Sequence, residues 1–178
     1  MKKFALALAA ALTAAATPAL AQEPADFSGA KASIITGYDV VDLNTPGVRN
    51  PDGLIYGIGL GYDIQKGSAV FGIEGEVADS TAKLKAGGAT IAETGRDLYI
   101  GGRVGFVTGK TLIYGKVGYT NARIKSVAGN SNGDGIRVGA GVEQKLTDTV
   151  FAKVEYRYSN YEADVERQQI VAGVGLRF

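Results

Sequence analysis

The fold class can be predicted from the nine residues Ile170-Val-Ala-Gly-Val-Gly-Leu-Arg-Phe178. The apolar residues of this segment alternate with small or polar ones, so that one face of the segment is apolar and the other is small or polar. This period of two predicts a β-strand. A transmembrane barrel needs such a strand at its end, because the last strand must pair with the first and lipid tolerates no open sheet edge. The question is whether the rest of the sequence supplies the other strands.

Seven further segments alternate in the same way, at about residues 30–41, 54–64, 69–77, 97–106, 113–119, 136–145 and 150–158. Long polar connections at 42–53, 79–95, 123–135 and 159–166 alternate with short turns at 65–68, 108–110 and 147–149. Outer-membrane barrels have tight periplasmic turns and longer outer loops. The sequence therefore predicts an all-β, eight-stranded antiparallel up-and-down transmembrane β-barrel, with both termini at the tight-turn end.

Periodicity alone does not say which face meets solvent. A soluble lipocalin-like barrel would point the apolar face inward. Here the polar face is largely glycine, of which the chain has 26, and the narrow lumen of an eight-stranded barrel requires small residues. The charges on that face are also balanced in sign. We therefore expect the apolar face to meet lipid and the polar face to line the interior.

The charged residues of the polar face are expected to form an ion-pair network in the lumen. Counting from the tight turns places Glu143 opposite Lys153 and Arg103 opposite Lys116, with Glu74 and Glu143 flanking and neutralising the two cations. A slip of one residue would turn such charges to lipid. The expected lumen network consists of Glu74, Glu76, Arg103, Lys116, Arg137, Glu143, Lys153, Glu155 and Arg157.

The amino terminus has the three parts of a secretory signal peptide. Lys2 and Lys3 precede an apolar run over residues 4–16, and Ala19 and Ala21 form a small-residue cleavage site. The alternative is a short membrane anchor, but the run is too short to span comfortably. We expect a cleavable signal peptide over 1–21 and a barrel domain over 22–178. No other stretch is apolar for long enough to be a transmembrane helix.

The composition excludes several kinds of chemistry. The chain has no Cys and no His, which removes disulfides, thiolate nucleophiles and Ser-His sites. Gly57-Ile-Gly-Leu-Gly61 has no following helix and so lacks the phosphate-binding mechanism. Glycosidase chemistry at Glu74, Glu143 and Glu155 is less favoured than a structural network. We expect no catalytic residue, no cofactor or metal site, and no nucleic-acid partner, since the net charge is +1.

Several motifs resemble the small outer-membrane β-barrels of Gram-negative bacteria, the OmpA-like transmembrane domains and the opacity-type, porin-like surface proteins. They are Gly115-Lys-Val-Gly-Tyr-Thr120, Gly139-Ala-Gly-Val-Glu143, Phe151-Ala-Lys-Val-Glu-Tyr-Arg-Tyr158 and Gly175-Leu-Arg-Phe178. The resemblance implies that the barrel-assembly machinery reads Phe178 as an assembly signal. Unlike OmpA, the sequence shows no carboxy-terminal peptidoglycan-binding domain, so no cell-wall tether is expected.

The leading hypothesis is a non-enzymatic protein of the cell outer membrane, exported through the periplasm, with a structural or surface-interaction role and a narrow, ion-paired lumen. Its expected partners are outer-membrane lipid and lipopolysaccharide, the assembly machinery, and a host or surface ligand of the outer loops. The alternative is a small porin-like channel for ions or very small solutes. A third hypothesis is an outer-membrane enzyme such as a lipid A deacylase, but the chain lacks the His of the usual site.

Overall fold

The computed structural model of the protein describes residues 25–42, 51–86, 89–126, 129–161 and 165–178, and of these it describes the side chains outside 83–94 and 124–131. The signal-peptide prediction, including Ala19 and Ala21, lies outside the described residues. In this part of the chain, no helix is long and apolar enough to cross a membrane.

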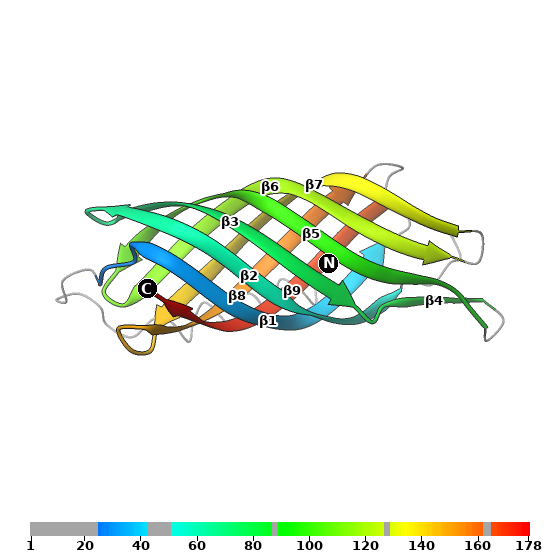
Figure 1. The fold of residues 1–178 in the computed structure, drawn as a ribbon, viewed down its shortest axis with the longest axis horizontal. Helices are drawn as coiled ribbons and strands as arrows, with labels where there is room; N and C mark the ends of the chain where they lie inside the picture. Colours follow the sequence, from blue (N-terminus) through cyan, green and yellow to red (C-terminus); the bar gives the residue numbers. More distant parts are fainter. Residues whose placement is uncertain (1–24, 43–50, 87–88, 127–128, 162–164) are drawn as a thin grey trace.

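The described chain is one closed antiparallel sheet. Neighbouring strands follow one another around the barrel, β9 pairs with β1, and β3 pairs with β5 to complete the ring (Figure 1). The eight-stranded transmembrane-type barrel predicted from the alternation is confirmed, and it is accompanied by one short extra strand, β4. The strands are β1 Gly29–Asp42, β2 Asp52–Lys66, β3 Ala69–Ser80, β4 Lys83–Ala86, β5 Ala89–Thr108, β6 Thr111–Ser126, β7 Gly129–Lys145, β8 Val150–Tyr161 and β9 Val165–Arg177.

The tight turns gather at the end of the barrel where the carboxyl terminus lies (left in Figure 1). Only two residues separate β2 from β3, and only two separate β5 from β6. Gly67 and Gly109 open these turns with φ values of +61° and +56°. A side chain disfavours this left-handed conformation, so glycine is the residue that closes such a hairpin without strain.

The outer connections are more regular than the sequence analysis predicts. The stretch 79–95 contains β4 and the start of β5, and β6 and β7 extend into the stretch 123–135. Register is kept there, with Arg123 opposite Asn132 and Lys125 opposite Asn130. These residues lack the apolar alternation that identifies a strand, but main-chain pairing continues through the hairpins beyond the lipid-facing stripe.

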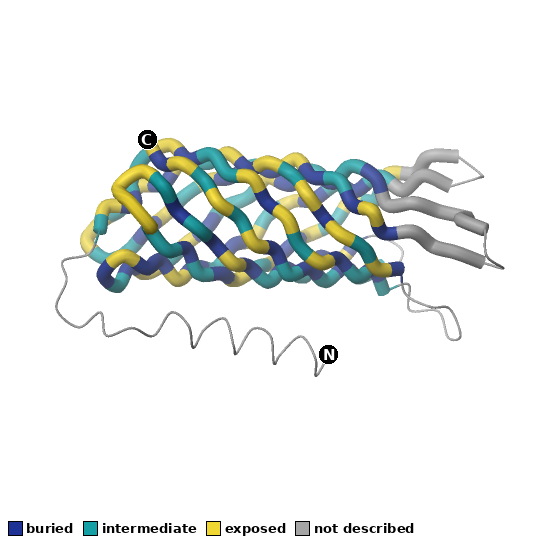
Figure 2. The backbone as a smooth tube through the Cα atoms, turned by 90° about the horizontal axis from the view of Figure 1, so that it is seen from below, coloured by how far each residue is buried: buried dark blue, intermediate teal, exposed yellow. Residues whose placement is uncertain are grey.

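Burial alternates along every barrel strand, as the colours of Figure 2 show. On β2, every second residue from Leu54 to Ile64 is exposed, with Ile58 at 56% and Leu60 at 62%. On β5 and β9, Ile100 and Val174 are likewise exposed, at 66% and 48%. The charged residues occupy the buried positions instead. An outer surface of this kind favours lipid, because a water-soluble protein rarely exposes an apolar area this continuous.

Candidate functional site

The interior of the barrel gathers most of the chain's polar chemistry. Among the described side chains, eight basic and seven acidic ones are buried, so the interior is close to electrically neutral. Each lies on the inward face because successive strand residues point to opposite sides of the sheet. Three groups of ion pairs, defined below, follow one another along the barrel axis.

The first group lies nearest the tight turns and is built on two arginines. The guanidinium of Arg103 lies 2.5 Å from Asp63 and 2.9 Å from Glu143. The guanidinium of Arg177 reaches the same two carboxylates, at 2.9 Å and 2.7 Å. Two forked cations thus share two carboxylates, which suits the planar geometry of arginine. Lys31 joins this group to the next, at 3.6 Å from Asp63 and 3.2 Å from Glu74.

The second group lies in the middle of the barrel and centres on Lys116. Its ammonium lies 2.7 Å from Glu74, 3.4 Å from Glu76 and 2.7 Å from Glu155. Arg157 pairs with Glu76 at 2.8 Å and also donates to Glu155. The cluster spans β3, β6 and β8, no two of which are neighbours in the sheet, so its contacts between strands run across the lumen.

Two further residues, Lys153 and Tyr114, complete the second group. Lys153 approaches Glu76 at 3.5 Å, the longest contact of the cluster. Tyr114 donates a hydrogen bond of 2.7 Å to Glu155, and its ring lies 4.8 Å from the guanidinium of Arg103. Tyr114 therefore links the first group to the second.

The third group lies toward the long connections. Arg137 pairs with Asp97 at 2.6 Å, and Arg167 bridges Asp97 and Asp39 at 2.9 Å and 2.6 Å. The ring of Tyr99 lies between this group and the middle one, 4.4 Å from the ammonium of Lys116 and 5.5 Å from the guanidinium of Arg137. The chain of charge and aromatic contacts is therefore continuous along the axis.

Inward glycines make room for the large side chains of the interior. A Cβ at Gly141 would lie 2.8 Å from the ring of Tyr114, and one at Gly175 would lie 2.4 Å from the ring of Phe151. Such distances leave no space for a side chain. The glycine-rich polar face thus accommodates aromatic rings and long cations that fold across the strands.

The segment before β1 closes the tight-turn end of the lumen. Phe27 is fully buried there, and its N–H donates 2.7 Å to the side chain of Gln65. Lys145 donates 2.8 Å to the carbonyl of Asp26, and Arg177 donates to that of Phe27. The N–H of Ser28 also donates to the Asp26 carboxylate, which lowers the pKa of that carboxyl. The ring of Phe27 packs in an apolar cluster with Val70, Val107, Leu112 and Tyr114.

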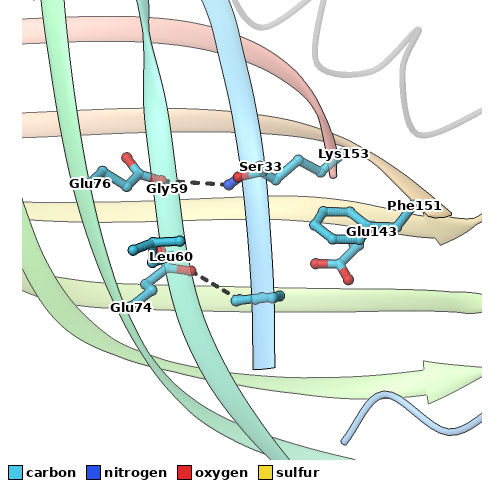
Figure 3. Close-up of a pocket in the computed structure, with 9 residues that line it drawn as sticks. Ser33, Gly59, Leu60, Glu74, Glu76, Glu143, Phe151 and Lys153 are labelled. Atoms are coloured by element: carbon cyan, nitrogen blue, oxygen red, sulfur yellow. Dashed lines mark hydrogen bonds and ion pairs between the residues drawn. The ribbon is translucent and has the colours of Figure 1, made fainter. Parts of the chain in front are cut away.

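A small cavity remains between the first and second groups of ion pairs (Figure 3). Its volume is about 10 Å³, close to the space of a single water molecule. Glu74 and Glu76 line one side and Glu143 and Phe151 another, and the ammonium of Lys153 turns toward Glu76. Such a space accommodates a water molecule with polar neighbours and excludes a substrate.

The structure places all nine residues of the expected lumen network on the inward face, each no more than 6% exposed. The predicted register is confirmed, since Arg103 faces Lys116 and Glu143 faces Lys153. The ion pairs do not follow register alone, however. Glu143 binds Arg103 and Arg177, whereas Lys153 turns to Glu76 on the other side of the lumen. Among the nine, Arg137 stands apart from the rest in the third group.

Six further charged residues belong to the interior but not to the predicted network. Five of them stand on the inward face of a predicted strand, so the alternation could have identified them. Arg167 lies before the predicted start of its strand, where the apolar stripe has already ended. The six are Lys31, Asp39, Asp63, Asp97, Arg167 and Arg177.

Two other expectations concern the remaining candidate residues. Phe178 is 74% exposed, and its N–H donates 2.8 Å to the carbonyl of Ala30 on the neighbouring strand. Its role as an assembly signal stays a prediction. Within the described residues, no group of three or more His, Cys, Asp or Glu side chains is arranged to hold a metal ion.

Comparison with known proteins agrees with the barrel fold described above. The family model described as outer membrane protein beta-barrel domain matches residues 7–178. The 25 kDa outer-membrane immunogenic protein of Brucella ovis is 32% identical over 146 residues, which cover 80% of this chain and 72% of that protein. The 22 kDa outer membrane protein of Rhizobium leguminosarum bv. viciae is 28% identical over 143 residues, covering 69% and 67%.

Two solved structures share the fold. The attachment invasion locus protein Ail of Yersinia pestis matches with a TM-score of 0.56 at 20% identity, covering 85% of this chain and 100% of that one. Neisserial surface protein A matches with a TM-score of 0.60 at 18% identity, covering 85% and 98%. Ail has also been solved in complex with the heparin analogue sucrose octasulfate.

Proposed function

The chain belongs to the outer-membrane β-barrel family, and from that premise we propose that it is a non-enzymatic barrel with a closed lumen and a structural or surface-interaction role. Its place is the cell outer membrane, like that of its named relatives. The tight-turn end then faces the periplasm, and the long connections face the exterior.

The filled interior carries this proposal. The three groups of ion pairs extend across the lumen from different strands, and Phe27 fills the periplasmic mouth. A conducting pore needs a continuous water-filled path, whereas the cavity between the first two groups holds about 10 Å³. An ion entering from either side would have to displace paired side chains. This favours a sealed barrel over the porin-like channel.

The same pairing argues against catalysis in the lumen. The interior carboxylates are bound to arginine or lysine, as at Glu76 and Glu155, and the cavity beside them is too small for a substrate. A general acid or base must reach the atom it protonates or deprotonates, which these buried groups cannot do.

The surface role rests on the part of the barrel that extends outward. The β4–β5 and β6–β7 hairpins continue the sheet beyond the lipid-facing stripe. Ail, which shares the fold, has been solved with a heparin analogue. We place the contact with a host or surface ligand on these outer hairpins, and we retain lipopolysaccharide and, through Phe178, the barrel-assembly machinery as partners.

Planar-bilayer recording tests the closed lumen. The refolded protein is expected to give no stable conductance steps. The variant Phe27→Ala is expected to be silent too, because the ion pairs above the periplasmic mouth remain in place. A well-characterised porin in the same bilayer provides the positive control.

Stable steps from the unaltered protein would refute the closed lumen and favour the channel. Steps from Phe27→Ala alone would show that the barrier is the segment before β1 and not the ion-pair groups.

A further inference from the structure

The outward face carries a ring of polar residues at the exterior end of the apolar stripe. Each barrel strand changes there from apolar to polar, and most of these residues are acidic or amides. Strand β5 differs, because Arg96 occupies this level, and β6 carries a second arginine, Arg123, just beyond it. The outward residues at this level are Asp42, Asp52, Asp79, Arg96, Asn121, Asp134, Asn160 and Gln168, with Arg123 one position farther out than Asn121.

A β-bulge brings the two arginines together. Register passes from Thr94 opposite Ile124 to Asp97 opposite Ala122, so Gly95 and Arg96 together face the single residue Arg123. β5 and β6 lie side by side here (Figure 1). Bulges re-aim side chains, and like charges on facing positions of neighbouring strands destabilise a sheet. This bulge therefore concentrates positive charge at one point of the rim.

Neither guanidinium has an anionic partner among the described residues. Arg96 makes one long hydrogen bond, 3.4 Å to Asn121, and its Nε is buried without a partner. Arg123 makes one contact of 3.3 Å to Asn132. Inside the barrel, by contrast, every arginine is paired with a carboxylate. Among the described side chains, the outer pair is thus a site of cationic donors with no carboxylate partner.

The surroundings indicate which anion would fit. Below the arginines lie Leu98 and the exposed side chains of Ile100 and Tyr119, on the lipid-facing surface. A ligand that contacts both the arginines and the apolar side chains below them must have an anionic headgroup at the exterior interface and apolar chains in the membrane. Guanidinium groups bind phosphate or carboxylate through paired N–H donors.

We propose that Arg96 and Arg123 bind the anionic headgroup of lipid A in the outer leaflet, with its acyl chains lying against Leu98 and Ile100. The site extends the general partnership with lipopolysaccharide to two residues and one headgroup. It depends on the placement in the outer membrane and not on the closed lumen, so bilayer conductance does not bear on it.

The test measures retention of lipid A by the folded protein in mixed micelles, using bisphosphorylated lipid A and dephosphorylated lipid A with the same acyl chains. The double variant R96Q/R123Q removes both charges. Its matched control is K66Q/K110Q, which removes two exposed charges at the periplasmic end, one from the end of β2 and one from the turn between β5 and β6. Gel mobility of unheated samples verifies folding, and the single variant R123Q serves if the double variant does not fold.

The unaltered protein and K66Q/K110Q are expected to retain the bisphosphorylated form at least about tenfold more tightly than the dephosphorylated form, which is the effect of one or two charge-assisted hydrogen bonds. R96Q/R123Q should lose this preference, and R123Q should lose part of it. Inorganic phosphate at millimolar concentration should not displace lipid A, because it lacks the acyl contacts.

Three results would overturn the proposal. The first is an undiminished phosphate preference in R96Q/R123Q, or in a folded R123Q if only the single variant is available. The second is equal retention of the two lipid forms by the unaltered protein. The third is complete displacement by inorganic phosphate, which would make the arginines a site for soluble anions.

Discussion

Replacing Glu155 by leucine is expected to lower the free energy of unfolding by about 3–5 kcal/mol, because the change removes one member of a buried ion cluster and leaves the others uncompensated. Glu155 is fully buried. It lies 2.7 Å from Lys116, accepts a hydrogen bond of 2.7 Å from Tyr114, and also accepts one from Arg157. Leucine supplies none of these contacts.

The magnitude should fall toward the lower end of that range. Lys116 keeps Glu74 at 2.7 Å and Arg157 keeps Glu76 at 2.8 Å, so neither cation is left alone. Glu155→Gln preserves the shape and can still accept from Tyr114, and it should cost less than leucine. The cost of Glu155→Gln measures the loss of the charge, and the further cost of Glu155→Leu measures the loss of the hydrogen bonds.

Equilibrium urea unfolding in lipid vesicles measures these effects, with the folded fraction read from the gel mobility of unheated samples. The chain has no Trp, so tryptophan fluorescence is not a readout. Asp148→Leu, in the exposed turn between β7 and β8, is the matched control and should change stability by less than about 0.5 kcal/mol. A loss at Glu155 as small as that at Asp148 would mean that the interior charges are solvated.

Arginine at Ile58 is expected to cost about 2–4 kcal/mol, since Ile58 stands near the middle of the lipid-facing stripe and a cation there is driven from the hydrocarbon. Its register neighbours on the adjacent strands, Ile34 and Val77, are exposed like Ile58 itself. An arginine at this point therefore has no polar group of the barrel surface beside it.

Leu54→Arg provides the internal control on the same strand and the same face. Leu54 is 58% exposed and stands two residues from the rim residue Asp52. Near the interface the cost of arginine falls to about 0–1 kcal/mol. The same vesicle unfolding assay measures both variants. Equal costs at Ile58 and Leu54 would contradict a depth-dependent lipid environment on this face.

The alternation of Leu54 to Ile64 against Gly57, Gly59 and Gly61 is enough to predict a strand and its two faces. The same rule applied to every segment predicts the barrel and its closure, because a slip of one residue would turn charges to lipid. The tight turns at Gly67 and Gly109 then determine which residues face each other.

Two features could not be predicted in this way. Ion-pair partners depend on how far long side chains reach across the lumen, as when Lys153 reaches Glu76 and not its register neighbour Glu143. The outer hairpins lack a periodic signal because nothing apolar distinguishes their two faces, so the sequence predicts a loop at residues such as Arg123. The bulge beside Arg96 lies at the edge of that same region.

Apolar side chains of the barrel face lipid while charged and small ones face a closed interior. Cysteine labelling on β2 distinguishes the two faces, since the chain has no Cys and single cysteines can be introduced one at a time. In a bilayer, cysteines at the even positions from Leu54 to Ile64 are expected to react with a lipid-soluble nitroxide reagent and to give high accessibility to oxygen, whereas a cysteine at the fully buried Ile55 is expected to stay unlabelled. Labelling at Ile55, or low oxygen accessibility at the even positions, would show that the apolar side chains do not face lipid.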